Sequence, residues 1–262
     1  MSDDLRKACV IGASSPGGLG EACALRLAQD GLAVTVAGRR MAPLEALSAR
    51  IGGRALPVDM TDEEDIARLA AECGPLDVLV NAAGTTDAAR LARISRQSIE
   101  AQFELHVTAN MLLIKHFAPL LRPGGSIVLF SSLTARVAGE GLAAYSCAKA
   151  AVEHLVRIAA LELGGAGVRV NAVAPGFSAT PMTEGIFANP ALAGLYVGEA
   201  PIGGRGVSPE EVADAVSWLA GERCFSSGET IQVSGGAQLG RLPRLTQIRQ
   251  AQGRVPALEG SG

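Results

Sequence analysis

The most constraining feature of this 262-residue chain is the alternation of short apolar segments with longer amphipathic ones. Several short segments are near-continuous runs of Val, Ile, Leu and Ala, which is typical of parallel strands buried on both faces. The sequence therefore predicts an α/β fold, with a doubly wound parallel sheet of about seven strands and helices on both faces. The expected strands are 8–11, 33–37, 55–58, 77–80, 126–130, 168–173 and 230–233.

Between these strands the pattern predicts helices at 21–29, 43–50, about 95–121 and 143–163, with Pro123-Gly124-Gly125 ending the third. Two further helices carry start signals. Thr61 opens one, with Glu64 three residues on as a capping box. Ser208 opens the other, followed by Pro209 and two acids.

The chain shows no linker and no internal repeat, so we expect one domain over residues 1–240. Two segments fall outside the alternation. Residues 177–207 are loop-like and rich in Gly and Pro, and we expect them to form a substrate lid. Residues 241–262 have four arginines and no strong periodicity, which predicts either a disordered tail or an arm reaching a neighbouring subunit.

Composition excludes several classes of protein. The net charge of −3 gives no electrostatic reason to expect a nucleic acid or an anionic membrane as partner. No apolar run reaches the roughly 18 residues of a membrane span, and the acidic start is unlike a secretory signal. The five cysteines form no C-x-x-C pair. We therefore expect reduced thiols, no metal site and a cytoplasmic protein.

A glycine-rich turn joins the first expected strand to the first expected helix. It reads Gly12-Ala13-Ser14-Ser15-Pro16-Gly17-Gly18-Leu19-Gly20. Glycines here let the backbone approach a pyrophosphate, whose charge is favoured by the N-terminus of the following helix. An ordinary tight turn is the plainer alternative, but the position after the first strand favours nucleotide binding.

Three more motifs follow in order. They are Asn81-Ala82-Ala83-Gly84 after the fourth strand, Tyr145-x-x-x-Lys149 on a helix, and Pro175-Gly176 after the sixth strand. Together with the glycine-rich turn, they resemble the short-chain dehydrogenase/reductase family over about residues 7–240. The resemblance implies a Rossmann-like domain, a nicotinamide cofactor and carbonyl–alcohol chemistry. The family's glycine motif is usually shorter, so Pro16 and Gly17 look inserted and should bulge the turn near the adenosine phosphates.

Tyr145 and Lys149 carry the expected acid–base chemistry. A free tyrosine has a pKa near 10, and bringing it close to 7 needs about 4 kcal/mol. The four-residue spacing puts both side chains on one helical face. An ammonium about 4 Å away, at an effective dielectric of about 20, supplies roughly that much. Tyr145 would then protonate a carbonyl oxygen as hydride arrives, or take the alcohol proton in reverse.

The resemblance adds further roles to this pair. It implies that Lys149 holds the nicotinamide ribose hydroxyls and that Ser132 hydrogen-bonds the substrate oxygen, with Ser131 as the alternative register. A fourth family position, usually Asn, relays protons and falls on His106 when the sequence is anchored on Pro119. His106 is then either a second relay with its own pH dependence or a packing residue.

Asn110 offers another reading of that fourth position. It lies one turn further along the same helical face as His106, and it could reach the site if the helix shifted.

The end of the second strand bears on the choice of cofactor. NAD sites usually place an acid there, but this chain has Arg39 and Arg40. Two guanidinium groups suit a 2′-phosphate, so NADP(H) is favoured and NAD(H) remains possible. The resemblance places Asp59 at the adenine and Thr180 at the nicotinamide amide, and Asn81 is expected to brace the sheet centre. The full set of expected cofactor-binding residues is Gly12, Ser14, Ser15, Gly18, Leu19, Gly20, Arg39, Arg40, Asp59, Met60, Asn81, Ala82, Ala83, Gly84, Tyr145, Lys149, Pro175, Gly176 and Thr180.

These features predict an NAD(P)(H)-dependent ketone reductase or alcohol dehydrogenase acting on a small carbonyl or alcohol substrate. The apolar side chains within 177–207 favour a hydrophobic or cyclic compound. The alternatives are a nucleotide-sensing protein without turnover, an epimerisation, or enoyl reduction. Ser132, Tyr145 and Lys149 argue against a sensor, and Ser132 argues against the enoyl case. The resemblance also implies a homotetramer or a dimer.

Overall fold

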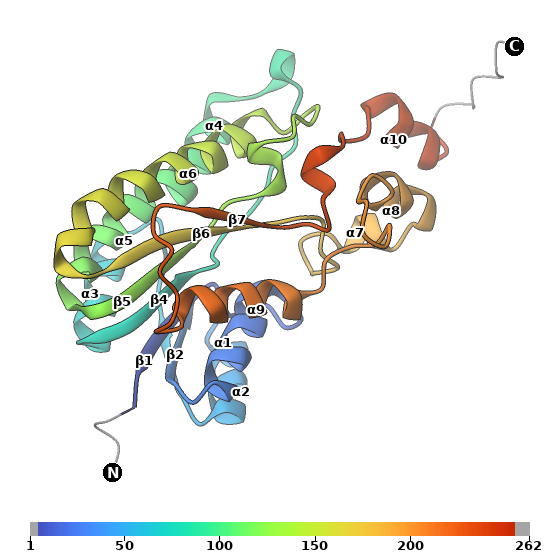
Figure 1. The fold of residues 1–262 in the computed structure, drawn as a ribbon. Helices are drawn as coiled ribbons and strands as arrows, with labels where there is room; N and C mark the ends of the chain where they lie inside the picture. The colour runs from blue at the N-terminus through green and yellow to red at the C-terminus, as the bar shows by residue number, and fades with distance from the viewer. Residues whose placement is uncertain (1–4, 255–262) are drawn as a thin grey trace, which may run out of the picture.

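The computed structural model describes residues 5–254, in which seven parallel strands form one sheet (Figure 1). Their order across the sheet is β3-β2-β1-β4-β5-β6-β7, with every neighbouring pair parallel. This confirms the predicted α/β class and the doubly wound sheet. The strands are β1 (Lys7–Ile11), β2 (Ala33–Gly38), β3 (Arg54–Pro57), β4 (Leu76–Asn81), β5 (Leu121–Phe130), β6 (Arg169–Pro175) and β7 (Thr230–Val233).

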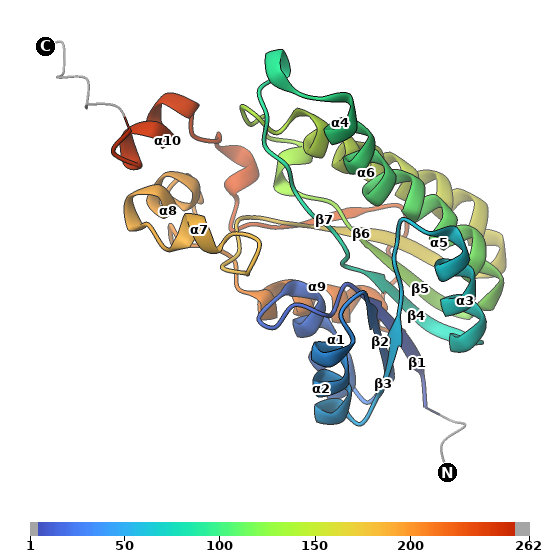
Figure 2. The same ribbon diagram turned by 180° about the vertical axis from the view of Figure 1, so that it is seen from behind.

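Helices cover both faces of the sheet (Figures 1 and 2). One face carries α1 (Leu19–Gln29), α2 (Met41–Ile51) and α9 (Pro209–Ala220), and the other carries α3 (Glu63–Cys73), α5 (Ala109–Phe117) and α6 (Ala143–Leu163). The remaining helices are α4 (Arg96–Phe103), α7 (Glu184–Phe187), α8 (Pro190–Val197) and α10 (Leu245–Ala251). No helix within residues 5–254 is both long and apolar enough to cross a membrane.

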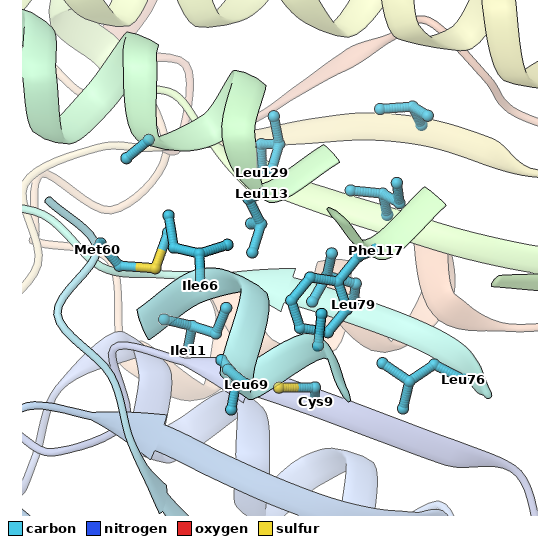
Figure 3. Close-up of a cluster of buried hydrophobic side chains, with 14 of the residues drawn as sticks. Cys9, Ile11, Met60, Ile66, Leu69, Leu76, Leu79, Leu113, Phe117 and Leu129 are labelled. Atoms are coloured by element: carbon cyan, nitrogen blue, oxygen red, sulfur yellow. The ribbon is translucent and has the colours of Figure 1, made fainter. Parts of the chain in front are cut away.

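The sheet divides the apolar core in two. On β1, Cys9 and Ile11 pack with α3 and α5 (Figure 3), while Ala8 and Val10 pack with α1 and α9 on the opposite face. Successive side chains of a strand point to opposite faces. Both faces are buried here, which is why this strand reads as a continuous apolar run.

The strand order reverses between β1 and β4. From β1 the chain passes to β2 on one side, whereas from β4 it passes to β5 on the other. The loops that leave β1 and β4 therefore diverge at the carboxyl edge of the sheet, and ligands of open α/β sheets bind in the crevice at this position. Gly12 follows β1, and Asn81 ends β4.

The long helix expected at 95–121 is interrupted. It comprises α4, a π-helical turn at Glu104–Thr108, α5 and a 3₁₀ turn at Ala118–Leu120. Strand β5 already begins at Leu121, which pairs with Leu76 across a register shift in the ladder. Gly124 accommodates that irregularity with a φ of +87° and donates to the carbonyl of Gly167. Pro123-Gly124-Gly125 thus lies inside a strand, contrary to our expectation.

Of the two expected helix caps, one is confirmed and one is wrong. Ser208 and Glu211 form the reciprocal capping box at the start of α9. The cap of α3 is Asp62, whose side chain accepts from the Glu64 backbone N–H. Thr61 instead donates its hydroxyl to Asp59 at 2.8 Å, so that oxygen is committed outside the helix.

The two segments outside the alternation contain helices. Residues 177–207 hold α7 and α8 and are joined at their base by a bridge between Ser178 and Val207, so this region is less loop-like than expected. The C-terminal segment forms α10, which lies beside α8 (Figures 1 and 2). The side chain of Asn189 donates to the Ala251 carbonyl at 3.3 Å. Residues 255–262 of the expected tail lie outside the described part.

Candidate active site

A cavity of about 800 Å³ opens at the carboxyl edge of the sheet, where the strand order reverses. Its size is in the range of small-molecule and cofactor sites. The expected cofactor-binding residues that line it are Gly12, Ser14, Ser15, Gly18, Leu19, Gly20, Arg39, Arg40, Asp59, Met60, Ala82, Ala83, Gly84 and Thr180.

Two glycines of the turn after β1 are required by close backbone contacts. Gly12 has a φ of +83°, and a Cβ there would lie 2.4 Å from the backbone nitrogen of Ala83. A Cβ on Gly20 would lie 2.4 Å from the carbonyl oxygen of Gly12. The turn after β1, the loop after β4 and the start of α1 are therefore pressed together, and they form the floor of the cavity.

The N-terminus of α1 is suited to a phosphate. Its N-cap is Gly18, and among the described residues no side chain caps this helix. The first-turn N–H groups of Leu19 and Gly20 are thus open to an anion, and the helix dipole favours negative charge there. The pyrophosphate of a nicotinamide dinucleotide fits this arrangement.

The residues that look inserted form their own turn. Gly18 N–H donates to the Ser15 carbonyl at 2.9 Å, with Pro16 and Gly17 between them and a φ of +72° at Gly17. Proline followed by a positive-φ glycine is typical of a type II turn. The Gly17 N–H donates to Glu21 at 2.6 Å, so it is not available to a phosphate. The inserted residues therefore reshape the rim of the cavity without adding a phosphate donor.

The adenosine corner carries two arginines and an acid. Arg40 donates to the Ser15 hydroxyl at 2.7 Å, which fixes its guanidinium at the rim of the cavity. Hydrogen bonds from the backbone and the hydroxyl of Thr61 lower the pKa of Asp59, and the charge of Arg39 acts in the same direction. The corner therefore presents two cations and one carboxylate.

Ser132, Tyr145 and Lys149 come together at the end of β5 and the start of α6. The Lys149 Nζ lies 5.7 Å from the centre of the Tyr145 ring and donates to the Phe130 carbonyl at 2.7 Å. The Ser132 oxygen accepts from both the N–H and the hydroxyl of Thr134, at 3.2 and 3.0 Å. A serine that accepts twice keeps its own O–H to donate. Ser131 points elsewhere, to Glu153 at 3.0 Å, so Ser132 is the serine beside Tyr145.

Burial shifts the pKa values of the pair in directions that differ from our expectation. It raises the pKa of Tyr145, and a hydrogen bond with Ser132 acts the other way. It lowers the pKa of Lys149 to about 7. Desolvation disfavours the charged form of each group. In the protein alone, the pKa of Tyr145 is therefore not lowered as the four-residue spacing predicted. It is Lys149 whose pKa lies near neutral pH.

His106 lies in the π-helical turn and is fully buried. Its ring meets that of Tyr145 edge-on, with centres 5.4 Å apart, and its Nε2 lies 2.8 Å from the Thr85 carbonyl. That carbonyl requires the proton on Nε2, so Nδ1 is an acceptor, and it has no partner in the described part of the chain. Burial and the nearby Lys149 charge lower the pKa of His106 to about 3, so the titration we expected near neutral pH does not arise.

Asn110 does not reach the catalytic groups. Its side chain donates to the His106 carbonyl at 2.7 Å and accepts from Asn81 at 2.9 Å. Asn81 in turn accepts from the Ala83 N–H at 3.1 Å. This buried chain of hydrogen bonds ties the end of β4 to the π-helical turn, and it fits the expected bracing position of Asn81.

Five expected cofactor residues do not line the cavity: Asn81, Tyr145, Lys149, Pro175 and Gly176. Tyr145 is separated from the cavity by His106. The His106 ring packs against the Tyr145 ring, and it lies 2.9 Å from the position that a Cβ on the cavity residue Gly84 would take. Gly176 N–H instead pairs with Val233 of β7. Sequence reasoning missed other lining residues, most of them neighbours of motif positions that carry no chemical signal of their own: Ile11, Gly38, Val58, Thr61, Thr85, Ala101, Glu104, Leu105, Pro181 and Met182.

Residues 12–238 match the sequence model of a family described as Enoyl-(Acyl carrier protein) reductase. A cis-4-hydroxycyclohexanecarboxylate dehydrogenase of Sinomonas cyclohexanicum is 38% identical over 88% of this chain and 96% of that protein. A 3-oxoacyl-(acyl-carrier-protein) reductase of Synechocystis sp. is 36% identical over 87% of this chain and 95% of that protein.

The chain is also similar in fold to solved structures. A short-chain type dehydrogenase/reductase from Mycobacterium ulcerans has a TM-score of 0.88 at 30% identity, covering 95% of this chain and 96% of that one. The Pseudomonas aeruginosa RhlG/NADP active-site complex has a TM-score of 0.83 at 31% identity, covering 89% of this chain and 96% of that one.

Proposed function

The chain belongs to the short-chain dehydrogenase/reductase family of NAD(P)-dependent oxidoreductases, and we propose that it interconverts a ketone and a secondary alcohol with NADP(H). The observation that carries the proposal is the meeting of the Ser132 hydroxyl, the Tyr145 phenol and the Lys149 ammonium beside the cofactor cavity. A paired donor and acid at one point suit a reaction that creates or removes an alcohol oxygen.

Each of these side chains has a separate task in the proposed reaction. The bound nicotinamide supplies or accepts the hydride. Ser132 donates a hydrogen bond to the substrate oxygen, since Thr134 already occupies its acceptor positions. Tyr145 passes its proton to the same oxygen during reduction and takes it back during oxidation.

Lys149 and His106 act next to the phenol. The Lys149 charge favours the phenolate and suits the ribose hydroxyls of the cofactor. His106 stays neutral and presents Nδ1 as an acceptor near Tyr145, so its proposed place is in proton relay rather than as a charged base.

The adenosine corner supports the preference for NADP(H). Arg39 and Arg40 stand at the rim where an NAD site usually has an acid. The hydrogen bond from Arg40 to Ser15 holds one guanidinium in place before a phosphate binds. Preorganised, charge-assisted hydrogen bonds favour the 2′-phosphate over a hydroxyl.

The surroundings of Ser132 support an apolar or cyclic substrate. A small apolar cluster lies beside it, made of Leu133, Val137, Leu142, Phe177, Ala200, Ala237 and Leu242. The relative from Sinomonas acts on a hydroxylated cyclohexane ring, and the one from Synechocystis on a 3-oxoacyl group. We propose the ring compound as the analogue, because the relative named for it is 38% identical over 88% of this chain.

The description of the matched family model supports a second candidate, reduction of an enoyl double bond. Ser132 distinguishes the two reactions. Ser132 is hydrogen-bonded with Tyr145, so the two hydroxyls can hold one substrate oxygen together. In a ketone the carbon that takes the hydride bears that oxygen, whereas in an enoyl thioester the hydride goes to a carbon two bonds away from the carbonyl carbon. We therefore favour carbonyl reduction.

The expected homo-oligomer, a tetramer or dimer in the cytoplasm, also remains part of the proposal. The five cysteines are free within residues 5–254, which agrees with a reducing compartment. Light scattering after size-exclusion chromatography measures the assembly, and a monomer at micromolar concentration would contradict it.

Oxidation of NADPH and NADH by the purified protein tests the function. The panel comprises cyclohexanone, 4-oxocyclohexanecarboxylate, a 3-oxoacyl thioester and an enoyl thioester, with Tyr145→Phe as control. We expect NADPH-dependent ketone reduction that falls by at least about 10²-fold in the variant. Equal turnover by Tyr145→Phe would contradict the proposed role of Tyr145. Turnover of the enoyl thioester alone would favour the second candidate. A preference for NADH would contradict the proposed role of Arg39 and Arg40.

A further inference from the structure

A buried carboxylate lies one turn beyond Lys149 on α6. Glu153 is 7% exposed. Its Oε1 accepts from the Ser131 hydroxyl at 3.0 Å, and its Oε2 lies 3.3 Å from the Nε of Arg136. Carboxylates are almost never fully buried unless they are paired, and Glu153 has both a hydroxyl and a guanidinium partner. The pairing joins α6 to the loop after β5.

Both partners of Glu153 bracket the serine of the proposed active site. The backbone is extended at Ser132, with φ of −158° and ψ of 152°. Successive side chains of extended backbone point in opposite directions. The Ser131 side chain therefore points to Glu153 and the Ser132 side chain points to Tyr145. The contact between Ser131 and Glu153 thus determines the direction of the Ser132 hydroxyl.

The same segment is also tied to α6 at Lys149. The Lys149 carbonyl lies 3.4 Å from the Ser131 hydroxyl and can accept from it, and the Lys149 Nζ donates to the Phe130 carbonyl. That bond depends on a lysine with a pKa of about 7, so it weakens as a charge-assisted contact when the ammonium deprotonates. The contacts of Glu153 do not involve that proton. They hold the segment on both sides of Ser132, at Ser131 and at Arg136.

We propose that Glu153, held by Arg136, is a positioning residue that fixes Ser132 against Tyr145. It lines no part of the cofactor cavity and acts only through the place of the serine segment on α6. The inference rests on the proposed function, because the aim of Ser132 matters for turnover only if a substrate oxygen binds there. A misplacement of about 1 Å in such a pair costs on the order of 10²-fold in rate.

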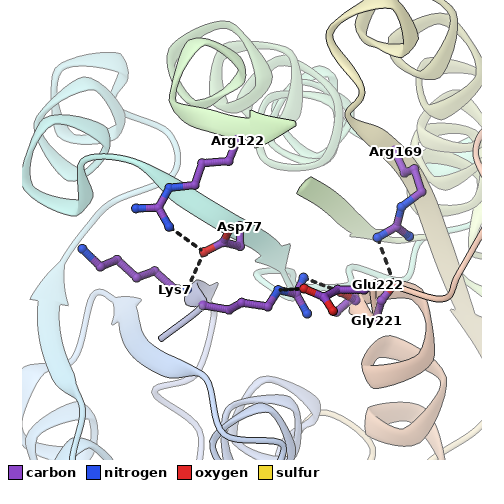
Figure 4. A network of polar contacts seen from close by, with 8 residues as sticks. Lys7, Asp77, Arg122, Arg169, Gly221 and Glu222 are labelled. Atoms are coloured by element: carbon purple, nitrogen blue, oxygen red, sulfur yellow. Dashed lines mark hydrogen bonds and ion pairs between the residues drawn. The ribbon is translucent and has the colours of Figure 1, made fainter. Parts of the chain in front are cut away.

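The chain offers a matched control at the opposite edge of the sheet. Asp77 lies 3.4 Å from Arg122 and accepts from the Lys7 N–H at 2.7 Å (Figure 4). The side-chain exposures are 14% and 41%, close to the 9% and 43% of Glu153 and Arg136. Asp77 and Arg122 stand at the starts of β4 and β5, whereas Ser132 follows the end of β5. This pair shares the burial and chemistry but not the location.

The experiment compares Glu153→Ala, Arg136→Ala, the double variant and Asp77→Ala. We measure kcat and KM for a reduced ketone, the Kd of NADPH and the Tm. We expect Glu153→Ala to lose about 10- to 100-fold in kcat with the nucleotide Kd within about twofold. The double variant should be no slower than Glu153→Ala, because the two residues act as one unit. Asp77→Ala should lower the Tm but leave kcat unchanged.

Glu153→Gln separates the hydrogen bond to Ser131 from the negative charge of Glu153. It keeps an oxygen for Ser131 and loses the ion pair, so we expect it to recover most of the kcat lost in Glu153→Ala. If Glu153→Ala does not fold, Arg136→Ala carries the comparison against Asp77→Ala at matched Tm. We expect it to lose kcat because it leaves the buried Glu153 carboxylate without its ion pair, and wild-type kcat in Arg136→Ala would overturn the inference.

The outcomes separate the inference from the proposed function. Wild-type kcat in Glu153→Ala, together with an inactive Tyr145→Phe, overturns the inference and leaves the function standing. Losses of kcat that multiply in the double variant, or equal losses in Asp77→Ala, also overturn it. Nucleotide binding by the wild type without turnover of any ketone overturns the function itself.

Discussion

The Nζ of Lys149 lies 5.7 Å from the centre of the Tyr145 ring and is hydrogen-bonded to the carbonyl at the end of β5. The phenol and the amine thus share one face of α6, as the four-residue spacing requires. Burial acts on both, and it is the lysine whose pKa falls to about 7. Lys149, which lies next to the Tyr145 phenol, can therefore gain or lose its proton near neutral pH.

Lys149→Met should change how stability depends on pH. The pKa of Lys149 in the folded protein, about 7, lies below the ordinary lysine value of 10.5, so between these values the unfolded chain binds more protons than the folded one. The stability of the wild type should therefore rise with pH across that window, and the variant should lack this contribution. Urea unfolding at pH 6 to 10 measures it. Parallel curves for the two proteins would contradict the lowered lysine pKa.

His106→Asn and His106→Leu should behave differently. Asn can still donate to the Thr85 carbonyl, whereas Leu leaves that buried acceptor unpaired at a cost of about 1–3 kcal/mol. Because the pKa of His106 is about 3, wild type and His106→Asn should share the same kcat profile above pH 5. Urea unfolding and pH–rate measurements check both points. An inflection near pH 6.5 that only the wild type shows would contradict a neutral His106.

Arg40→Ala should weaken NADPH binding and spare NADH. Loss of charge-assisted hydrogen bonds to a 2′-phosphate costs about 1.5–3 kcal/mol, which is roughly 10- to 150-fold in Kd. Ser15→Ala, which only frees the guanidinium, should have a smaller effect in the same direction. Arg157→Ala, an exposed cation on α6, is the control. Equal losses for NADPH and NADH would show that Arg40 does not read the phosphate.

Gly12→Ala should abolish nucleotide binding and destabilise the fold, because its Cβ would lie 2.4 Å from the Ala83 nitrogen. Gly31→Ala is the control, since its φ is similar at +88° and no described atom lies within 4 Å of its Cβ position. It should lose only the roughly 1–2 kcal/mol of a left-handed alanine. Thermal unfolding and NADPH fluorescence titration compare the two. Similar behaviour would mean that the close approach of the two loops is dispensable.

The sequence by itself determined the framework. Strands such as β1 and helices such as α6 follow from local apolar periodicity, and the alternation of strand and helix then leaves few arrangements other than a doubly wound sheet. The spacing of Tyr145 and Lys149 placed them on one helical face, and the glycines after β1 located a turn that lines the cavity. These are properties of neighbouring residues, so no distant contact was needed to predict them.

Only the tertiary structure decided what the side chains meet. The π-helical turn that buries His106, the bond that turns Asn110 towards Asn81, and the pairing of Glu153 with Arg136 all join residues from separate elements. The pKa directions of Tyr145 and Lys149 also reversed our expectation for the phenol, because desolvation is set by everything packed around a group. Periodicity is read along the chain, whereas burial and pairing arise only when remote segments share one space.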